Sequence, residues 1–347
     1  MIDTWIMNTP FTKNTLDSFI SRPGICALDT AGNLDDDVLV LGASGKMGPH
    51  LCLMLKRCFE QAGKSNRVIA VSRFSSPDSK RWFKKNGIQT ITCDLSDTVQ
   101  LEKLPDAENL WFMAGVKFGA SDKPELLHKM NVEMPGLVTQ RFKNSRIAAL
   151  STGCVYSFVP VTSAGSTEDG ETASESGYAE SCRGREKAFC DASEKSGLRT
   201  ILIRLTYSVE MRYGVLVDIA QKVLHRQPID ISMNRFNCIW QGDALSYIIA
   251  SINLAKSPAD ILNITGEEIL SIRETAITFG KLFDVNPIFT GVEQDTAWLN
   301  NSQKAFDHFG KPSLTSEQMI PWIADWLKNG GETLGKPTKF EVRNGKF

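Results

Sequence analysis

The sequence lacks a charge excess of either sign. Its 347 residues include 39 basic and 40 acidic side chains, which leaves a formal net charge of −1. Because a nearly neutral chain creates no strong field, we expect no nucleic-acid partner and no anionic membrane partner. The sequence also lacks an apolar run of 18 residues, and Asp3 stands where a leader would be basic. We therefore expect no transmembrane span, no signal peptide and a cytoplasmic location.

Paired cysteines and clustered histidines are missing as well. None of the eight cysteines belongs to a Cys-x-x-Cys pair, and most have apolar neighbours in the sequence. This usage favours reduced thiols over a disulfide framework. The four histidines, at positions 50, 128, 225 and 308, are scattered. The sequence therefore predicts no metal site.

Short apolar strands alternate with amphipathic helices between residues 37 and 205. Six strands are expected, at 37–42, 67–72, 89–93, 109–113, 146–151 and 199–203. Such alternation predicts right-handed βαβ crossovers, and hence an α/β fold with a Rossmann-like, doubly wound parallel sheet. Residues 206–347 are expected to form a smaller, mainly substrate-binding region with a C-terminal tail. This region would cap the carboxyl ends of the strands, where ligands of such sheets bind.

Residues 1–36 precede the first expected strand. Their apolar side chains include Trp5, Ile6, Phe11, Leu16 and Phe19. A segment with this many large apolar groups favours an N-terminal extension that contains a helix and packs on the body or on a partner. Disorder is the alternative.

Residues 38–48 join an apolar strand to three glycines. The run Val-Leu-Val-Leu-Gly-Ala-Ser-Gly-Lys-Met-Gly leads into an expected helix at 49–62. The first glycine permits a tight turn, the second lets the backbone approach a pyrophosphate, and the third packs the helix so that its N-terminus faces the anion. The flanking strand and helix supply the context that this motif needs. A tight turn without any ligand is the alternative.

The Gly-x-x-Gly-x-x-Gly spacing resembles that of the short-chain dehydrogenase/reductase superfamily. The chain length suggests its extended branch, the nucleotide-sugar epimerases and dehydratases. Further segments resemble landmarks of that family in the same order, at 94–95, 110–115, 131, 151–156, 178 and 262–273. The resemblance spans about residues 37–330 and implies a dinucleotide-binding domain at 37–205.

The resemblance implies NADP or NAD as the cofactor. The candidate cofactor-binding residues are Gly42, Ser44, Gly45, Lys46, Met47, Gly48, Arg73, Asp94, Leu95, Ala114, Gly115, Asn131 and Tyr178. At the end of the second strand, an acidic residue would accept hydrogen bonds from the ribose of NAD. Arg73 stands there instead, and a guanidinium pairs with a 2′-phosphate, so we expect a preference for NADP. NAD bound beside a solvated Arg73 is the alternative.

Tyr178 and Thr152 are the candidate catalytic residues that the resemblance implies. The family's tyrosine exchanges a proton with the substrate, and its serine or threonine hydrogen-bonds the reacting oxygen. Thr152 lies 26 residues before Tyr178, a workable separation. Each residue also has a structural alternative, because a helix-start tyrosine can be exposed and a strand-end threonine can bond to nearby backbone.

The family's lysine, four residues after the tyrosine, has no counterpart here. Cys182 stands in its place, while Glu186 keeps the later spacing of the family pattern. A phenol with a pKa near 10 and no neighbouring cation is a poor base at neutral pH, so proton transfer would be slow unless another cation reaches Tyr178. Arg183 and Lys187 are the nearest cations considered on that helix, although both are displaced from the lysine position.

The reaction and substrate are less narrowly defined. Two positions that are often acidic in sugar dehydratases are Gly153 and Cys154, so elimination of water by that route is not expected. Epimerisation, carbonyl reduction or loss of activity remain. Arg212, Trp240 and Asn237 are the candidate substrate contacts. The substrate is expected to be a small molecule, either a sugar, a sugar acid or a nucleotide-sugar.

Two functions therefore remain open. The first is an NAD(P)-dependent oxidoreductase or epimerase that uses Tyr178 and Thr152. The second is a dinucleotide-binding sensor or scaffold without turnover, which Cys182 favours. The resemblance also implies a homodimer, formed by helices at about 124–143 and 178–195.

Overall fold

The computed structural model describes residues 9–116, 123–173 and 177–343. A seven-stranded sheet in the order β12-β7-β5-β4-β1-β2-β3 forms its centre, and every neighbouring pair is parallel. The strands are β1 (Val38–Leu41), β2 (Val68–Ser72), β3 (Gln89–Thr92), β4 (Asn109–Phe112), β5 (Arg146–Thr152), β7 (Arg199–Leu205) and β12 (Asp260–Ile264). This is the doubly wound order, so the predicted Rossmann-like fold is confirmed.

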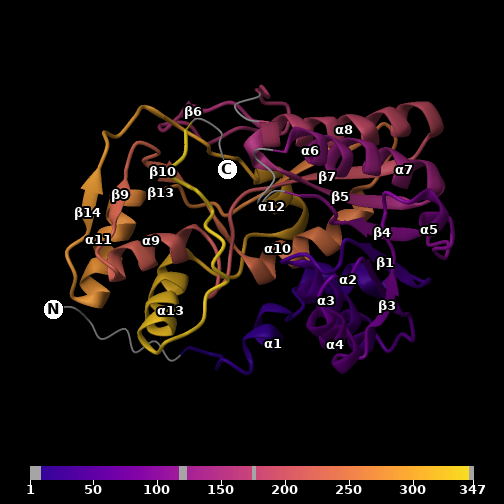
Figure 1. Ribbon diagram of the computed structural model, residues 1–347, viewed down its shortest axis with the longest axis horizontal. Coiled ribbons are helices and arrows are strands. Elements are labelled where there is room, and N and C mark those ends of the chain that lie inside the picture. The colour runs from indigo at the N-terminus through magenta and orange to yellow at the C-terminus, as the bar shows by residue number, and fades with distance from the viewer. Residues whose placement is uncertain (1–8, 117–122, 174–176, 344–347) are drawn as a thin grey trace.

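Helices cover both faces of this sheet (Figure 1). Successive residues of β1 point to opposite layers: Val38 and Val40 join one apolar cluster, and Leu39 and Leu41 join the other. The helices that follow the strands of the first half are α3 (Gly48–Gln61), α4 (Pro77–Lys85), α5 (Thr98–Glu102), α6 (Pro124–His128), α7 (Met134–Arg141) and α8 (Gly177–Ser196). A π-helical turn, η1 (Lys129–Glu133), joins α6 to α7, and a short 3-10 turn, η2 (Gly153–Val155), follows β5.

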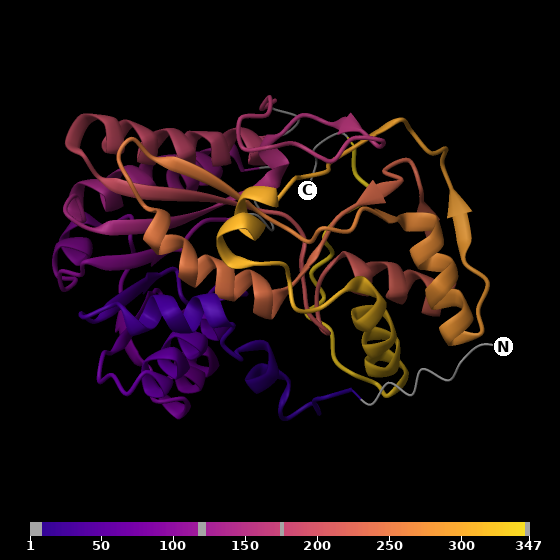
Figure 2. The same cartoon turned by 180° about the vertical axis from the view of Figure 1, so that it is seen from behind.

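The later part of the chain forms a second, smaller region beside the strand ends (Figure 2). Its helices are α9 (Val215–Leu224), α11 (Ile272–Phe283) and α13 (Ser316–Lys328), whereas α12 (Gln303–Phe309) packs against β12 at the edge of the main sheet. Short paired strands connect them: β6 (Val159–Pro160), β8 (Ser208–Val209), β9 (Pro228–Asp230), β10 (Arg235–Phe236), β11 (Ile239–Trp240), β13 (Leu270–Ser271), β14 (Ile288–Thr290) and β15 (Thr296–Ala297).

Two elements from residues 206–347 belong to the main sheet layers instead. Strand β12 adds a seventh strand beside β7, at a place where no strand was expected. Helix α10 (Gln241–Ala250), which continues into the 3-10 turn η3 (Ser251–Leu254), packs against α3. The indole of Trp111 in β4 donates a 2.8 Å hydrogen bond to the carbonyl of Ile248 in α10.

The described part of the N-terminal extension, from residue 9, contains two helices, α1 (Leu16–Ile20) and α2 (Ile25–Gly32), and α2 packs against α10 and α3. Asp17 in α1 contacts three separate parts of the body. Its carboxylate lies 3.0 Å from Nε2 of His50, 3.2 Å from the Trp82 indole and 2.9 Å from the Arg212 guanidinium. Trp5 and Ile6, which contributed to the expectation of a packed extension, lie outside the described residues.

Within the described residues, no helix combines the length and apolar character needed to cross a membrane. All eight cysteines are described, and each is a free thiol.

Candidate functional site

The glycine loop turns sharply between β1 and α3. Gly42 has φ of +82°, a region that side chains rarely adopt, and a Cβ there would lie 2.6 Å from the backbone of Ala114. The close approach brings the end of β1 against the end of β4. Gly48 is the first residue of the 14-residue helix α3, so backbone N–H groups at the helix start face the loop. This arrangement fits an anionic pyrophosphate.

A first cavity, here called the glycine-loop cavity, lies at the carboxyl ends of β1 to β4 and has a volume of about 200 Å³. It brings together eight of the predicted cofactor-binding residues. From the loop and β2 come Gly42, Ser44, Gly45 and Arg73, and from the neighbouring strand ends come Asp94, Leu95, Ala114 and Gly115. The Ser44 and Ser72 hydroxyls share a short hydrogen bond across the loop.

Asp94 is held as an anion beside Arg73. Its carboxylate accepts hydrogen bonds from the backbone N–H and hydroxyl of Ser96, and these, with the nearby Arg73 charge, lower the pKa of Asp94. The cavity therefore offers one carboxylate and one exposed guanidinium close together. The carboxylate can accept hydrogen bonds from a nucleoside, and the guanidinium can pair with a phosphate.

A second cavity, here called the tyrosine cavity, has a volume of about 170 Å³ and contains both candidate catalytic residues. Thr152 comes from the end of β5, and Tyr178 comes from the first turn of α8. Two predicted cofactor-binding residues, Lys46 and Met47, also line this cavity. The Thr152 hydroxyl accepts a 3.3 Å hydrogen bond from the Cys154 N–H, which leaves its own proton available to a ligand.

The Tyr178 phenol is protonated at neutral pH. Burial raises its pKa well above 10, the neighbouring Cys182 thiol raises it further, and the positive charge of Arg185 acts in the opposite direction. Cys182 itself is buried and packs with Val155 and Tyr156 in a small cluster. A neutral phenol can donate a proton to a substrate oxygen.

Arg185 is the buried cation on this face of α8, and the sequence analysis missed it. Its guanidinium donates a 2.9 Å hydrogen bond to the Leu150 carbonyl and a 2.6 Å hydrogen bond to Oδ1 of Asn131. A Cβ on Gly115 would lie 2.1 Å from this guanidinium, so the charge borders the glycine-loop cavity. Arg183 and Lys187, the cations considered from sequence, are exposed, and Lys187 pairs with Asp191 at 2.8 Å.

A spacing signal could have identified Arg185. It follows Tyr178 by seven residues, which is nearly two helical turns and returns it to the same face. Long helical side chains lean toward the helix N-terminus, so an arginine here reaches back toward the tyrosine.

Asn131, a predicted cofactor-binding residue, is fully buried in the η1 turn and organises the loop after β4. Its side chain accepts from Val116 N–H at 3.0 Å and donates to the Val116 carbonyl at 3.0 Å and to the Ser181 hydroxyl at 2.9 Å. It also accepts from Arg185. Asn131 and Gly48 line neither cavity.

Glu186 anchors α8 to the sheet beneath the tyrosine cavity. Its carboxylate accepts from the Ser151 hydroxyl at 2.6 Å and from the Arg204 guanidinium at 3.0 and 2.8 Å. Both ionic side chains are buried, and because they are fully paired they fix the position of the helix that carries Tyr178.

The three predicted substrate contacts lie elsewhere. Arg212 pairs with Glu210 at 3.2 Å and with Asp17. Trp240 is buried, with its ring centroid 5.6 Å from that of Phe19 in the extension. Asn237 is buried and donates a 2.5 Å hydrogen bond to the Asn300 carbonyl, so it supports a residue of the tyrosine cavity without lining it.

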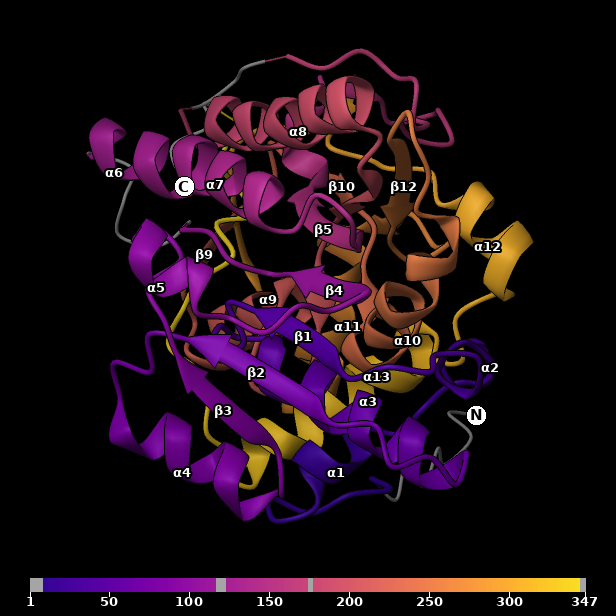
Figure 3. The ribbon, with the colours of Figure 1, turned by 90° about the vertical axis from the view of Figure 1, so that its right-hand side faces the viewer.

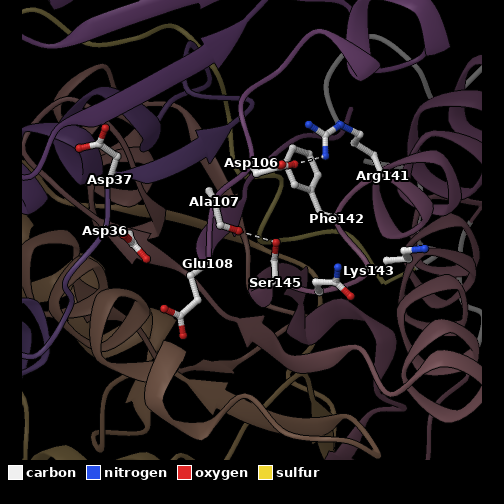
Figure 4. A pocket seen from close by; sticks show the side chains of 10 residues that line it. Asp36, Asp37, Asp106, Ala107, Glu108, Arg141, Phe142, Lys143 and Ser145 are labelled. Atoms are coloured by element: carbon white, nitrogen blue, oxygen red, sulfur yellow. Dashed lines mark hydrogen bonds and ion pairs between the residues drawn. The ribbon is translucent and has the colours of Figure 1, made fainter.

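A third, wider cavity of about 670 Å³ lies at the opposite, amino-terminal ends of the strands (Figure 4). Its charged side chains include Asp36, Asp37 and Glu108, while Arg141 pairs with Asp106 at 2.7 Å. Ligands of doubly wound sheets bind at the carboxyl ends, so this cavity is not assigned to the site. The described residues include no cluster of side chains suited to hold a metal ion.

The order of the strands, the glycine loop and the tyrosine at the carboxyl edge define a dinucleotide-binding α/β protein of the short-chain dehydrogenase/reductase type. The NAD dependent epimerase/dehydratase family matches residues 38–228, which is more than half of the chain. The chain belongs to this family.

Solved structures share the fold at low sequence identity. UDP-glucuronic acid 4-epimerase from Bacillus cereus, in complex with NAD, superposes with a TM-score of 0.69 at 17% identity, over 84% of this chain and 99% of that one. The dTDP-glucose 4,6-dehydratase DesIV from Streptomyces venezuelae, with NAD bound, gives 0.70 at 16%, over 84% and 97%. UDP-glucose 4-epimerase from Thermotoga maritima gives 0.68 at 14%, over 85% and 99%. None of the curated proteins compared with the chain matches it.

Proposed function

We propose that the chain is an NAD(P)-dependent oxidoreductase or epimerase that acts on a hydroxyl or carbonyl carbon of a sugar-like substrate. The observation that carries this proposal is the adjacency of the two cavities. The glycine loop lines the glycine-loop cavity through Ser44 and Gly45, and it lines the tyrosine cavity through Lys46 and Met47. A dinucleotide on this loop would therefore reach Tyr178 and Thr152.

The residues present fit a dinucleotide. The φ of Gly42 and the start of α3 suit a pyrophosphate, and Asp94 with Arg73 suit the adenosine end. When bound, the nicotinamide ring of the cofactor accepts and returns a hydride.

Tyr178 exchanges the proton that accompanies this hydride. In reduction, its neutral phenol donates the proton to the carbonyl oxygen of the substrate; in oxidation, the same oxygen returns the proton to the phenolate. Thr152 donates a hydrogen bond to the reacting oxygen and holds it in place. Arg185 supplies the positive charge that favours the phenolate, in place of the lysine that position 182 lacks. Epimerisation requires both directions in sequence, with the hydride returned to the opposite face.

The test is Tyr178→Phe, which removes the proton donor and keeps the ring. Substrate turnover with NAD or NADP should fall by about 10²- to 10⁴-fold, the range typical of a lost general acid or base. Dinucleotide affinity, measured by calorimetry, should change little. A dinucleotide-binding sensor would instead show no turnover in either protein. Failure of the wild-type chain to bind any of NAD, NADH, NADP and NADPH would refute the proposal at its first step.

The proposal extends to the setting of the enzyme. We infer a homodimer through α7 and α8, which lie side by side on one face of the sheet (Figure 3), and a cytoplasmic location in keeping with eight free thiols. Light scattering of the purified chain should give twice the monomer mass of 38.4 kDa. A monomeric mass would refute the proposed dimer. Cell fractionation that finds the chain outside the cytoplasm would refute the proposed location.

A further inference from the structure

The wall of the tyrosine cavity holds polar atoms without partners. Thr206 Oγ1, Ser208 Oγ and both side-chain polar atoms of Asn300 make no hydrogen bond with any residue that the structure describes. These three residues are only 7%, 6% and 2% exposed. Because buried polar groups are almost always hydrogen-bonded in native proteins, these three residues are candidates for contacts with a ligand in the cavity.

These atoms stand directly beside the proposed reaction centre. A Cβ on Gly153 would lie 1.9 Å from Thr206 Oγ1 and 2.4 Å from Asn300 Nδ2, and Gly153 follows Thr152 in the chain. The set contains two hydroxyls and one amide, which can both donate and accept. A ligand with several hydroxyl groups could both donate hydrogen bonds to these side chains and accept hydrogen bonds from them.

Lys46 adds a positive charge to the same cavity. Its ammonium group lies 3.7 Å from the centroid of the Tyr213 ring and 3.5 Å from the Ser208 carbonyl, and it forms no ion pair with a described residue. Burial is the main cause that lowers its pKa, to about 7. A bound anion would favour the charged form and supply the partner that the ammonium lacks.

The chain after α13 limits the size of the ligand. Residues 332–343, here called the C-terminal strap, run in an extended path from α13 past α9 toward β6 (Figure 1). Asp218 in α9 accepts 2.6 Å hydrogen bonds from the N–H and the hydroxyl of Thr338, and Arg343 donates a 2.6 Å hydrogen bond to the Thr296 carbonyl. Thr338 lines the tyrosine cavity. At about 170 Å³, the cavity lies below the roughly 300 to 1,000 Å³ of sites for drug-sized ligands.

We propose that the tyrosine cavity binds a free monosaccharide acid, with its carboxylate on Lys46 and its hydroxyls on Thr206, Ser208 and Asn300. The inference rests on the proposed function and narrows its substrate class to an anionic sugar without an attached nucleotide. A single-ring or open-chain sugar acid matches the charge, the hydroxyl wall and the size together.

The experiment is a calorimetric titration of the full chain, with and without a saturating dinucleotide. The probes are D-glucuronate, D-galacturonate, D-gluconate and D-galactonate, with D-glucose and UDP-glucuronate for comparison. At least one free acid should bind with a dissociation constant below roughly a millimolar and at least about tenfold more tightly than D-glucose or UDP-glucuronate.

Two variants assign the contacts. Lys46→Met should weaken binding of that acid by about tenfold or more, while the affinity for D-glucose changes less than about twofold. Lys84→Met, which alters an exposed lysine in α4, is the matched control and should change nothing. Thr206→Val, which removes one hydroxyl, should weaken the acid and D-glucose alike by about three- to tenfold.

Other results would overturn the inference. Tighter binding of UDP-glucuronate, or binding of none of the four acids, would refute the small acid as ligand. A loss of NAD affinity in Lys46→Met without any effect on the acid would assign Lys46 to the cofactor pyrophosphate. These failures differ from failure of the proposed function, which is read from the dinucleotide titrations and from the turnover of Tyr178→Phe.

Discussion

At the residue scale, the charge of Arg185 acts on the buried phenol of Tyr178. The phenol is buried, so forming a phenolate costs free energy, and Arg185 is the group on α8 whose charge offsets part of that cost. The guanidinium is held in place by Asn131 and by the Leu150 carbonyl. Its position is therefore fixed before any ligand binds.

Loss of the Arg185 charge should raise the pKa of Tyr178 further. Phenolate formation by Tyr178 can be followed as the difference in ultraviolet titration between a protein and the same protein with Tyr178→Phe. In Arg185→Met, this difference titration should move to higher pH. Oxidation of substrate at a fixed mildly alkaline pH should slow by about tenfold for each unit of that shift. Arg185→Lys should recover most of the rate, and Arg183→Met is the exposed control. An unmoved titration would show that Arg185 acts only by packing.

Arg73 should determine the preference between the two dinucleotides. It is exposed at the edge of the glycine-loop cavity beside Asp94, where a 2′-phosphate would lie. Arg73→Ala should weaken NADP by about 1.5–3 kcal/mol, the value of a charged hydrogen bond, and leave NAD nearly unchanged. Calorimetry with both dinucleotides measures this. Equal losses for NAD and NADP would assign Arg73 to a group that both cofactors share.

Residues that directly follow strand ends were the easier part of the site to predict. The glycine loop, Arg73 and Asp94 follow strand ends, and strand ends meet at one edge of a parallel sheet. Thr206 also follows a strand end, that of β7, and Ser208 stands two residues later. Asn300 and Thr338 carry no such local signal, because they reach the tyrosine cavity from separate loops that only the tertiary structure brings together.

At the scale of elements, the expected strands agree with β1 to β5 and β7 within about two residues, because each is a short apolar run between helices. Strand β12 was missed, since its sequence Asp-Ile-Leu-Asn-Ile carries a buried asparagine. Asn263 is satisfied by distant groups: it donates to the Ser166 and Asn301 carbonyls and accepts from the Tyr156 hydroxyl. A strand with a buried polar residue depends on such distant contacts, so the local sequence pattern does not predict it.

The docking of α1 should depend on pH through Asp17. The hydrogen bond from His50 is the largest cause that lowers the pKa of this carboxyl group, and the Arg212 charge adds to it. A lowered pKa stabilises the folded chain above the ordinary carboxyl pKa of about 3.9, and the benefit is lost as pH falls toward the folded value.

Asp17→Asn should therefore destabilise the chain at pH 7 by about 1–2 kcal/mol, a value discounted because the carboxylate is partly exposed. Denaturant unfolding at several pH values measures the difference from wild type, which should shrink below about pH 4. Asp29→Asn, on the exposed face of α2, is the control. A difference that stays constant down to pH 3 would contradict the electrostatic account.

At the scale of the whole molecule, the two cavities divide the chain unequally. The glycine-loop cavity is built from residues between Gly42 and Met134, whereas the tyrosine cavity draws on residues from Lys46 to Thr338. The smaller region thus contributes to the tyrosine cavity alone, whereas the first half of the chain contributes to both cavities. The boundary expected at residue 205 follows the sequence pattern. In the structure, β12 and α10 lie after this boundary and yet pack with the main sheet and its helices.

This unequal division has a consequence during biosynthesis. A ribosome that adds about 5–20 residues per second completes the last segment of the glycine-loop cavity about 200 residues, or roughly 10–40 seconds, before it adds Thr338. Throughout that interval the nascent polypeptide carries the elements of a nucleotide pocket and lacks the strap that closes the neighbouring one. The chain therefore acquires its two cavities in a fixed temporal order, the glycine-loop cavity first and the tyrosine cavity last.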